Sequence, residues 1–318
     1  MRRLASLWLV VSVGATPAAA AESASPPLPN IIGPSAAEAP DLAYGAFQRG
    51  YFITAFQEAM KRVQANPNDA VAMTLIGELY RQGYGVVQNY AAAAHWYAMA
   101  ADRGNREAIF ALASAKLIGQ GIAKDPVGAK ALFEKAAAMN HSGALYNLGV
   151  MAVENSAGPD FDKAAAYFKS SAQLGYPDAA YELALCYRNG KGVPQDDQLA
   201  AFWMERAASE DNVPAEVEFA IMLFNGIGVE KDEEAAARLF LKAAVQQNPV
   251  AQNRVARLYA AGRGIQKDLV EAMKWHLIAR AAGEKDAWLD GVLNTLTPQQ
   301  KAEVETAIRQ YNGELSLQ

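Results

Sequence analysis

The chain has little of what catalytic and metal sites are usually built from. Its 318 residues include three histidines and a single cysteine, Cys186. One cysteine cannot form an internal disulfide, and a reactive thiol needs an exposed, electropositive setting that nothing near Cys186 indicates. The histidines, at positions 95, 141 and 276, do not approach the spacing of metal ligands. The sequence therefore predicts no catalytic residue, no metal site and no cofactor.

Long apolar runs are also scarce. The longest lies near the start, where Arg2 and Arg3 precede an apolar stretch at residues 4–13 and small residues follow at 18–21. This order is typical of a secretory signal peptide, which we assign to residues 1–21. Ten apolar residues are too few to span a bilayer core of ~30 Å, although an uncleaved anchor stays open as the alternative. We therefore expect a periplasmic or secreted protein, exported through a cleaved Sec-type signal.

Basic side chains are fewer than acidic ones, 29 against 34. The formal net charge is −5, and removing residues 1–21 takes away two arginines and no carboxylate, which leaves −7. Nucleic acids and anionic lipid surfaces attract a basic field, so the sequence disfavours both as partners. Residues 22–40 are rich in Ala, Pro and Ser and carry little that could pack, so we predict a disordered leader there.

A short phrase containing two glycines recurs along the chain at nearly constant intervals. Its copies are separated by 36, 71, 36 and 36 residues, so the long gap holds one unit that has lost the glycine pair and one residue. A fixed period of this length is typical of stacked identical units rather than of one globular core. The glycine pairs are Gly83/Gly85, Gly119/Gly121, Gly190/Gly192, Gly226/Gly228 and Gly262/Gly264.

Each unit contains two apolar patterns with helical spacing. Counted from an alanine such as Ala72, a small residue stands five positions on, and this stripe predicts a first helix, A. The glycine pair ends helix A as a cap, and an Asp or Asn then caps a second helix, B. Helix B holds an alanine in every unit and a large residue three positions later, which we expect to pack against the small residue of helix A. These large residues are Trp96, Leu132, Tyr167, Trp203, Leu239 and Trp275.

The landmarks L-G-x-x-Y, G-x-G-V, D, A-x-x-W-Y and A-A-x-x-G resemble the Sel1-like repeat, which is related to the tetratricopeptide repeat. The resemblance covers six units between Ala72 and Gly283 and implies an all-α, right-handed solenoid of antiparallel helix pairs. We expect a tetratricopeptide-like helix pair at residues 41–69, six repeats at 70–285, and a capping helix (about 298–311) with a tail at 286–318. The third unit has residues 155–158 in place of the glycine pair, which predicts a distorted turn but not a broken stack.

By analogy with tetratricopeptide stacks, helix A should line the concave side. In the middle units its inward positions are largely apolar, and such a surface is either buried or faces a partner. Arg81 and Arg257 fall in the same columns in the end units. The candidate partner-binding residues are Phe110, Leu117, Tyr146, Val150, Tyr181, Leu185, Arg188, Ile221 and Phe224.

The resemblance implies a non-enzymatic interaction scaffold or regulator that binds a protein or peptide in this groove. Some exported relatives restrain membrane sensor kinases, so a sensor's extracytoplasmic domain is one candidate partner. Two alternatives stay open. One is an assembly factor for cell-wall or polysaccharide machinery. The other is a β-lactam-binding or hydrolytic enzyme, a role attributed to cysteine-rich relatives whose disulfides this chain cannot form. The sequence leaves the oligomeric state open.

Overall fold

The computed structural model describes residues 41–155 and 157–315, and within these ranges the regular secondary structure is entirely helical. The predicted signal peptide (1–21) and leader (22–40) lie outside the described residues. The helices are α1 (Leu42–Gln48), α2 (Phe52–Ala65), α3 (Ala70–Gln82), α4 (Tyr90–Asp102), α5 (Arg106–Ile118), α6 (Pro126–Ala137), α7 (Ser142–Val153), α8 (Phe161–Gln173), α9 (Pro177–Asn189), α10 (Asp197–Ser209), α11 (Val213–Asn225), α12 (Glu233–Val245), α13 (Pro249–Ala261), α14 (Leu269–Ala281), α15 (Ala287–Thr295) and α16 (Pro298–Leu315).

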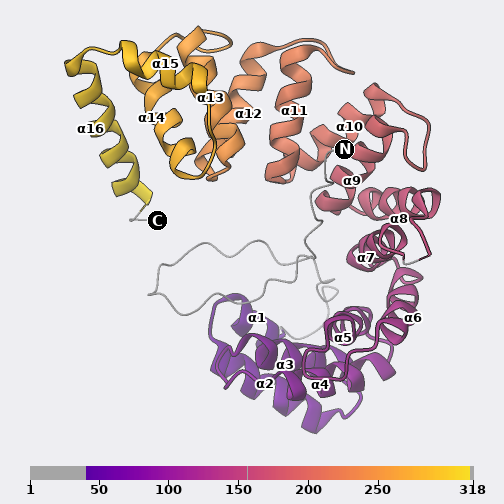
Figure 1. The fold of residues 1–318 in the computed structure, drawn as a ribbon. Coiled ribbons are helices and arrows are strands. Elements are labelled where there is room, and N and C mark those ends of the chain that lie inside the picture. Colours follow the sequence, from indigo (N-terminus) through magenta and orange to yellow (C-terminus); the bar gives the residue numbers. More distant parts are fainter. Residues whose placement is uncertain (1–40, 156, 316–318) are drawn as a thin grey trace.

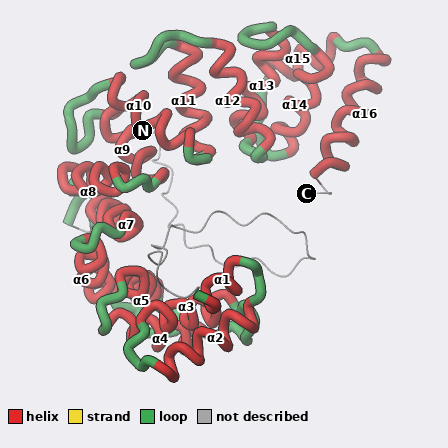
Figure 2. The backbone as a smooth tube through the Cα atoms, turned by 180° about the vertical axis from the view of Figure 1, so that it is seen from behind, coloured by secondary structure: helices red, strands yellow, loops and turns green. Residues whose placement is uncertain are grey.

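The helices form consecutive pairs that stack side by side into a curved arch (Figures 1 and 2). Helix A of each unit is an odd-numbered helix from α3 to α13, and helix B is the even-numbered helix that follows it. In the middle of the arch α5, α7 and α9 lie on the inner side, whereas α6, α8 and α10 lie outside them. The predicted all-α solenoid of paired helices is therefore confirmed. None of the described helices is long and apolar enough to cross a membrane.

Short polar side chains begin the B helices, as the sequence predicts. The side chain of Asp125 accepts a hydrogen bond from the Gly128 amide at 2.8 Å, and Asp232 accepts one from the Ala235 amide at 2.8 Å. Each such bond satisfies an amide that has no partner inside the helix. Asn89, Asp196 and Asp268 make the same bond, and Asp160 makes it in the third unit.

The glycine pair does two different things. The first glycine ends helix A in the left-handed conformation, with φ between 62° and 80° in the five units that have it. The second glycine also has positive φ and lies against the first turn of the B helix of the preceding unit. A Cβ on Gly85 would stand 2.6 Å from the Ile53 amide nitrogen, and one on Gly228 would overlap the Asp197 carbonyl. The loop therefore packs directly against the preceding unit at a position where only glycine fits.

The third unit departs from this pattern in its turn alone. Helix α7 ends at Val153, and Glu154 follows with φ −87° instead of a left-handed glycine. Helices α7 and α8 still pack on each other, so the stack continues through the unit. The sequence predicts both the altered turn and the intact stack.

The core differs from the prediction by one residue of register. The large residue that faces the small position of helix A stands four positions after the helix-B alanine, not three. A Cβ on Gly77 would lie 2.7 Å from the Tyr97 ring, and one on Gly149 would lie 2.5 Å from the Phe168 ring. The reason is that four residues complete just over one helical turn, which keeps the alanine and the large residue on one face. All members of this column are buried: Tyr97, Phe133, Phe168, Met204, Phe240 and His276.

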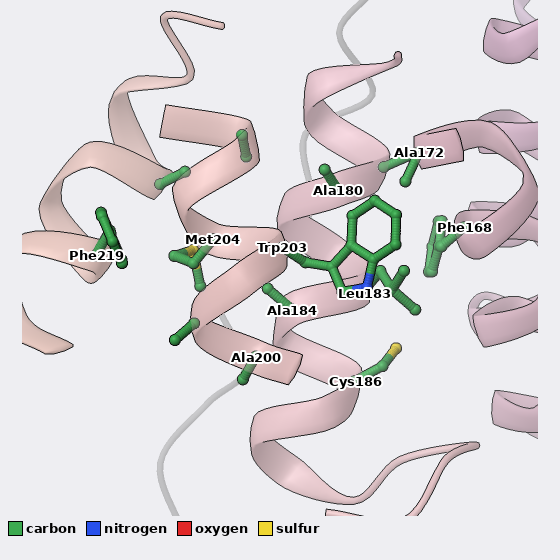
Figure 3. Packing of buried hydrophobic residues seen from close by; sticks show 14 of the residues in the cluster. Phe168, Ala172, Ala180, Leu183, Ala184, Cys186, Ala200, Trp203, Met204 and Phe219 are labelled. Atoms are coloured by element: carbon green, nitrogen blue, oxygen red, sulfur yellow. The ribbon is translucent and has the colours of Figure 1, made fainter. Parts of the chain in front are cut away.

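The residues three positions after the alanine sit at the edge of this core. Four of the six are only partly buried, and Trp203 and Trp275 are buried. Figure 3 shows the ring of Trp203 beside Leu183 of α9, and Met204 belongs to the same buried cluster. Both columns therefore contribute to the core, and the inner one was missed by the sequence argument.

Both ends of the stack are closed by extra helices. At the start, Phe52 of α2 stacks on Tyr84 with ring centroids 4.4 Å apart. At the other end α16 packs on α14, with Val304 buried and Tyr311 against Trp275 at 5.2 Å. Thr297 and Gln300 form the predicted capping box at its N-terminus. The sequence missed α15, and α16 extends four residues beyond the predicted end.

Candidate functional site

The nine candidate residues all fall on helix A of units two to five, in α5, α7, α9 and α11. They are not equally accessible. Val150 is only 5% exposed and belongs to the core, so it offers a partner almost no surface. The other eight are half-buried, and the apolar ones pack with one side against the core clusters. The apolar side chains of the concave face therefore pack against the core on one side and remain accessible to solvent on the other.

Two of the aromatic candidates are covered by neighbours. Phe110 stacks on the ring of His141 at 4.2 Å. His141 is the N-cap of α7, because its Nδ1 accepts a hydrogen bond from the Ala144 amide, while its Nε2 lies 3.0 Å from Glu107. Phe110 thus holds a capping residue in place and is mainly a packing residue.

Phe224 is covered from the other direction. The guanidinium of Arg263, which belongs to the next unit, lies 4.2 Å from the centre of its ring. Arg263 also forms an ion pair with Glu233 at 2.5 Å, so its guanidinium is held by both the ring and the carboxylate. A partner would have to displace this arginine to reach the ring.

The arginines expected along the groove all have carboxylate partners. Arg81 pairs with Glu78 at 2.7 Å, and Arg188 pairs with Glu218 at 2.6 Å. Arg257 binds Asp286 through two nitrogens, at 2.5 and 2.9 Å. The concave face therefore has no row of free positive charge.

Negative charge is instead left over near the middle of the arch. We define the acidic–aromatic patch as Tyr146 of α7, Tyr176 before α9, and Asp178, Tyr181 and Glu182 of α9. The rings of the first two tyrosines lie 5.1 Å apart. Asp178 accepts a hydrogen bond from Asn212 at 2.7 Å, and no ion pair to it forms among residues 41–155 and 157–315. Glu182 has neither a hydrogen bond nor an ion pair within the described residues.

The environment of the patch disfavours the charged form of its acids. Burial raises the pKa of Glu182 to about 7, and the adjacent charge of Asp178 adds to this rise. Burial also raises the pKa of Asp178. Burial, then the charges of Glu182 and Asp178, raise the pKa of Tyr146. An arriving cation would meet two acids without counterions beside tyrosine rings.

Sequence reasoning missed Asp178 and Glu182. Glu182 stands three positions after the first alanine of its unit, in a column that holds five residue types in six units: Leu75, Ala111, Asn147, Glu182, Glu218 and Arg254. A column that varies while its neighbours stay small or apolar faces out of the core. That variation was the signal that could have identified this face.

The remaining titratable groups show structural roles. Cys186 is buried, and burial raises the pKa of its thiol to about 11, so it is a poor nucleophile at neutral pH. His276 is buried in the core column, with its Nε2 2.9 Å from Asp290. No group of three or more metal-ligating side chains comes together in the part of the chain that the structure describes.

Comparison with known sequences identifies the repeat. The Sel1 repeat family matches residues 70–105, 106–141, 142–176, 177–212, 214–248 and 249–284. The chain is 40% identical over 77 residues to an F-box protein of Arabidopsis thaliana, covering 23% of each chain. It is 31% identical over 122 residues to the Sel1-repeat-containing protein YjcO of Escherichia coli K12, covering 37% of this chain and 53% of the relative. The chain thus spans about a quarter and about half of these curated relatives.

Solved structures show the same architecture. A Sel1 repeat protein from Oxalobacter formigenes is 27% identical, with a TM-score of 0.67 over 76% of this chain and 98% of the other. The protective antigen c5321 of uropathogenic Escherichia coli is 24% identical, with a TM-score of 0.51 over 85% of this chain and 67% of the other. The second likeness concerns the fold alone.

Proposed function

The chain belongs to the Sel1 repeat family, and from that premise we propose that it is a non-enzymatic interaction protein that holds a segment of a protein partner against its concave face. Helical scaffolds of this family are typical of protein–protein interaction. The observation that supports this site is the row of half-buried side chains on helix A of successive units, chiefly Tyr146, Tyr181, Leu185 and Ile221. Such side chains are fixed in advance, which lowers the entropy that binding costs.

We further propose that this interaction takes place outside the cytoplasm. The support is the predicted signal peptide at residues 1–21, which would direct the folded part to the periplasm or beyond. Within that compartment the partner class we propose is the extracytoplasmic domain of a membrane sensor kinase. The alternative is a component of cell-wall or polysaccharide assembly.

Site-specific photo-crosslinking in cells tests the concave face directly. A photoreactive phenylalanine analogue would replace Tyr181, and the matched control would carry it at Phe202, which is exposed on outer helix α10. We expect adducts from position 181 and few from position 202. Mass spectrometry of the adducts would separate a sensor from assembly machinery. Equal crosslinking at both positions, or crosslinking at 202 alone, would contradict the proposed site.

Truncation of the same side chains gives an independent check. We expect Tyr181→Ala combined with Leu185→Ala to weaken capture of the crosslinked partner, while the helical circular dichroism stays close to that of the parent. Phe110 is unsuitable here because it packs on the His141 cap. A large loss of helicity would show that these side chains are needed by the fold itself.

The proposal of a non-enzymatic role has its own test. We expect the purified exported form to leave the β-lactam nitrocefin unhydrolysed under conditions in which a β-lactamase control turns it over. Hydrolysis that follows the protein through purification would contradict the proposal.

A further inference from the structure

We propose that the partner segment is basic, and that one of its lysine or arginine side chains occupies the acidic–aromatic patch of Tyr146, Tyr176, Asp178, Tyr181 and Glu182. This inference rests on the proposed function and specifies the partner's chemistry at the same face. It follows from charge complementarity, from the tyrosine rings around the two acids, and from the position of Glu182 in its helix.

The first step concerns charge. The three arginines in the columns predicted to line the groove each have a carboxylate: Arg81 has Glu78, Arg188 has Glu218, and Arg257 has Asp286. Asp178 and Glu182 lie together in the acidic–aromatic patch, and neither has an ion pair in the described part of the chain. The patch therefore lacks a neutralising positive charge, and a basic segment is the complementary partner.

The second step concerns the tyrosines. The rings of Tyr146 and Tyr176 lie 5.1 Å apart, and Tyr181 stands on the same helix as both acids. Aromatic faces attract an ammonium or guanidinium group, and the apolar stem of a long basic side chain packs on such rings. An acidic peptide would meet only repulsion here, and an uncharged one would leave the acids unpaired.

The third step separates a binding role from a structural one. Asp178 lies in the first turn of α9, where the helix dipole favours a carboxylate, and it bonds Asn212, the N-cap of α11. Asp178 is therefore useful to the fold even without a ligand. Glu182 lies in the second turn, beyond the reach of that effect, and makes no bond. Half-burial of an unpaired carboxylate costs stability, and an arriving cation would remove that cost.

Peptide selection tests the inference without knowledge of the natural partner. The exported form of the chain would be panned with a phage-displayed library of random dodecapeptides, with Tyr181→Ala protein as the negative selection. We expect the surviving peptides to be enriched in lysine and arginine relative to the unselected library. Binding of one synthetic survivor would then be measured by fluorescence anisotropy at low and high salt.

The decisive variant is Glu182→Gln, which keeps the shape of the side chain and removes its charge. We expect it to weaken the basic peptide about tenfold or more, as loss of one half-buried ion pair predicts. Glu234→Gln, on an exposed acid of α12, should leave the affinity within about twofold. Thermal melts of both variants would confirm that each is folded.

The outcomes separate the two proposals. Peptides that need Tyr181 but show no basic enrichment, or that bind Glu182→Gln as tightly as the parent, would overturn the inference and leave the proposed face intact. If no selected peptide depends on Tyr181, the proposed function of the concave face fails as well.

Discussion

Single residues in this chain divide into columns that repeat and columns that vary. The helix-B alanines, from Ala93 to Ala272, are buried in every unit because a larger side chain there would collide with the facing helix. The column of Glu182 holds apolar, polar, acidic and basic residues in different units, so packing constrains it far less. Columns that keep the same residue type in every unit therefore indicate core packing. Columns that vary indicate where a binding surface can differ between units.

Glu182 provides the prediction at this scale. Its pKa is raised from 4.5 to about 7 in the folded state, so the fold favours its neutral form. The stabilisation is fully present below about pH 4.5, where the acid is protonated in both states, and is lost as the pH rises toward 7. We expect Glu182→Gln to stabilise the protein at pH 8 by about 1–3 kcal/mol and to have little effect at pH 4.

Chemical denaturation at the two pH values would measure this difference. Glu234→Gln is the matched control, and we expect its stability to follow the parent at both pH values. A parent protein that gains stability between pH 5 and pH 7 relative to Glu182→Gln would contradict the assignment, because the sign would be reversed.

At the scale of elements, the loop between helices A and B holds its unit against the preceding one, and we call it the fastening loop. Its second glycine lies against the first turn of the B helix in the preceding unit. The residue between the two glycines contacts the same turn. Tyr84 stacks on Phe52, Lys191 lies 5.0 Å from the ring of Phe161, and Arg263 pairs with Glu233. The loop thus joins two units in addition to ending one helix.

Two glycines of one loop allow this role to be separated from helix capping. Both Gly226 and Gly228 have positive φ, so alanine at either costs about 1–2 kcal/mol. A Cβ on Gly226 would meet only the Lys231 side chain at 3.3 Å, whereas one on Gly228 would overlap the Asp197 carbonyl. We therefore expect Gly228→Ala to lower the free energy of unfolding by at least about 1 kcal/mol more than Gly226→Ala, measured by urea denaturation. Equal losses would show that the loop does not fasten the units.

The sequence predicts the elements better than their contacts. Caps and helix periods depend on local residues such as Asp125 and Gly119, so helix order could be read directly. The second glycine was taken as part of a cap because its partner, the preceding B helix, is distant in sequence. Asp211 and Gln247 also take left-handed φ of 59° and 62° after their B helices, where glycine or asparagine stands in other units. The backbone conformation of those two turns is set by tertiary packing, because neither residue type favours left-handed φ strongly enough to predict it.

For the whole molecule, the way neighbouring units stack determines which side chains of the concave face are accessible to a partner. The sequence places Tyr181 and Leu185 on the inner helices, but it could not show that Arg188 is already neutralised by Glu218 of the next unit. It also could not show that Phe110 covers His141. Both facts depend on how neighbouring units rotate against each other. This is why the candidate face changed from an apolar trough lined with arginines to one with an acidic, aromatic centre.

Among the described residues of the repeat array, the junction between α6 and α7 lacks the fastening loop. The connection between α7 and α8 has no glycine pair, and a Cβ on Gly158 there would meet nothing within 4 Å. By its place in the repeat, such a loop would cover the first turn of α6. In a solenoid, stability is close to a sum of units and the interfaces between neighbours. The junction between α6 and α7 should then be the weakest interface in the repeat array.

Hydrogen exchange under native conditions would locate this weakness. We expect the central amides of α6 to be protected about tenfold less than those of α10, which corresponds to about 1.4 kcal/mol in the free energy of opening. Helix α10 is the matched reference because the Gly228 loop covers its first turn. A weak junction would let the two parts of the arch bend relative to each other and adjust the concave face to its partner. Equal protection in both helices would show that core packing alone holds the junction closed, and the arch would then present its partner with a fixed curvature.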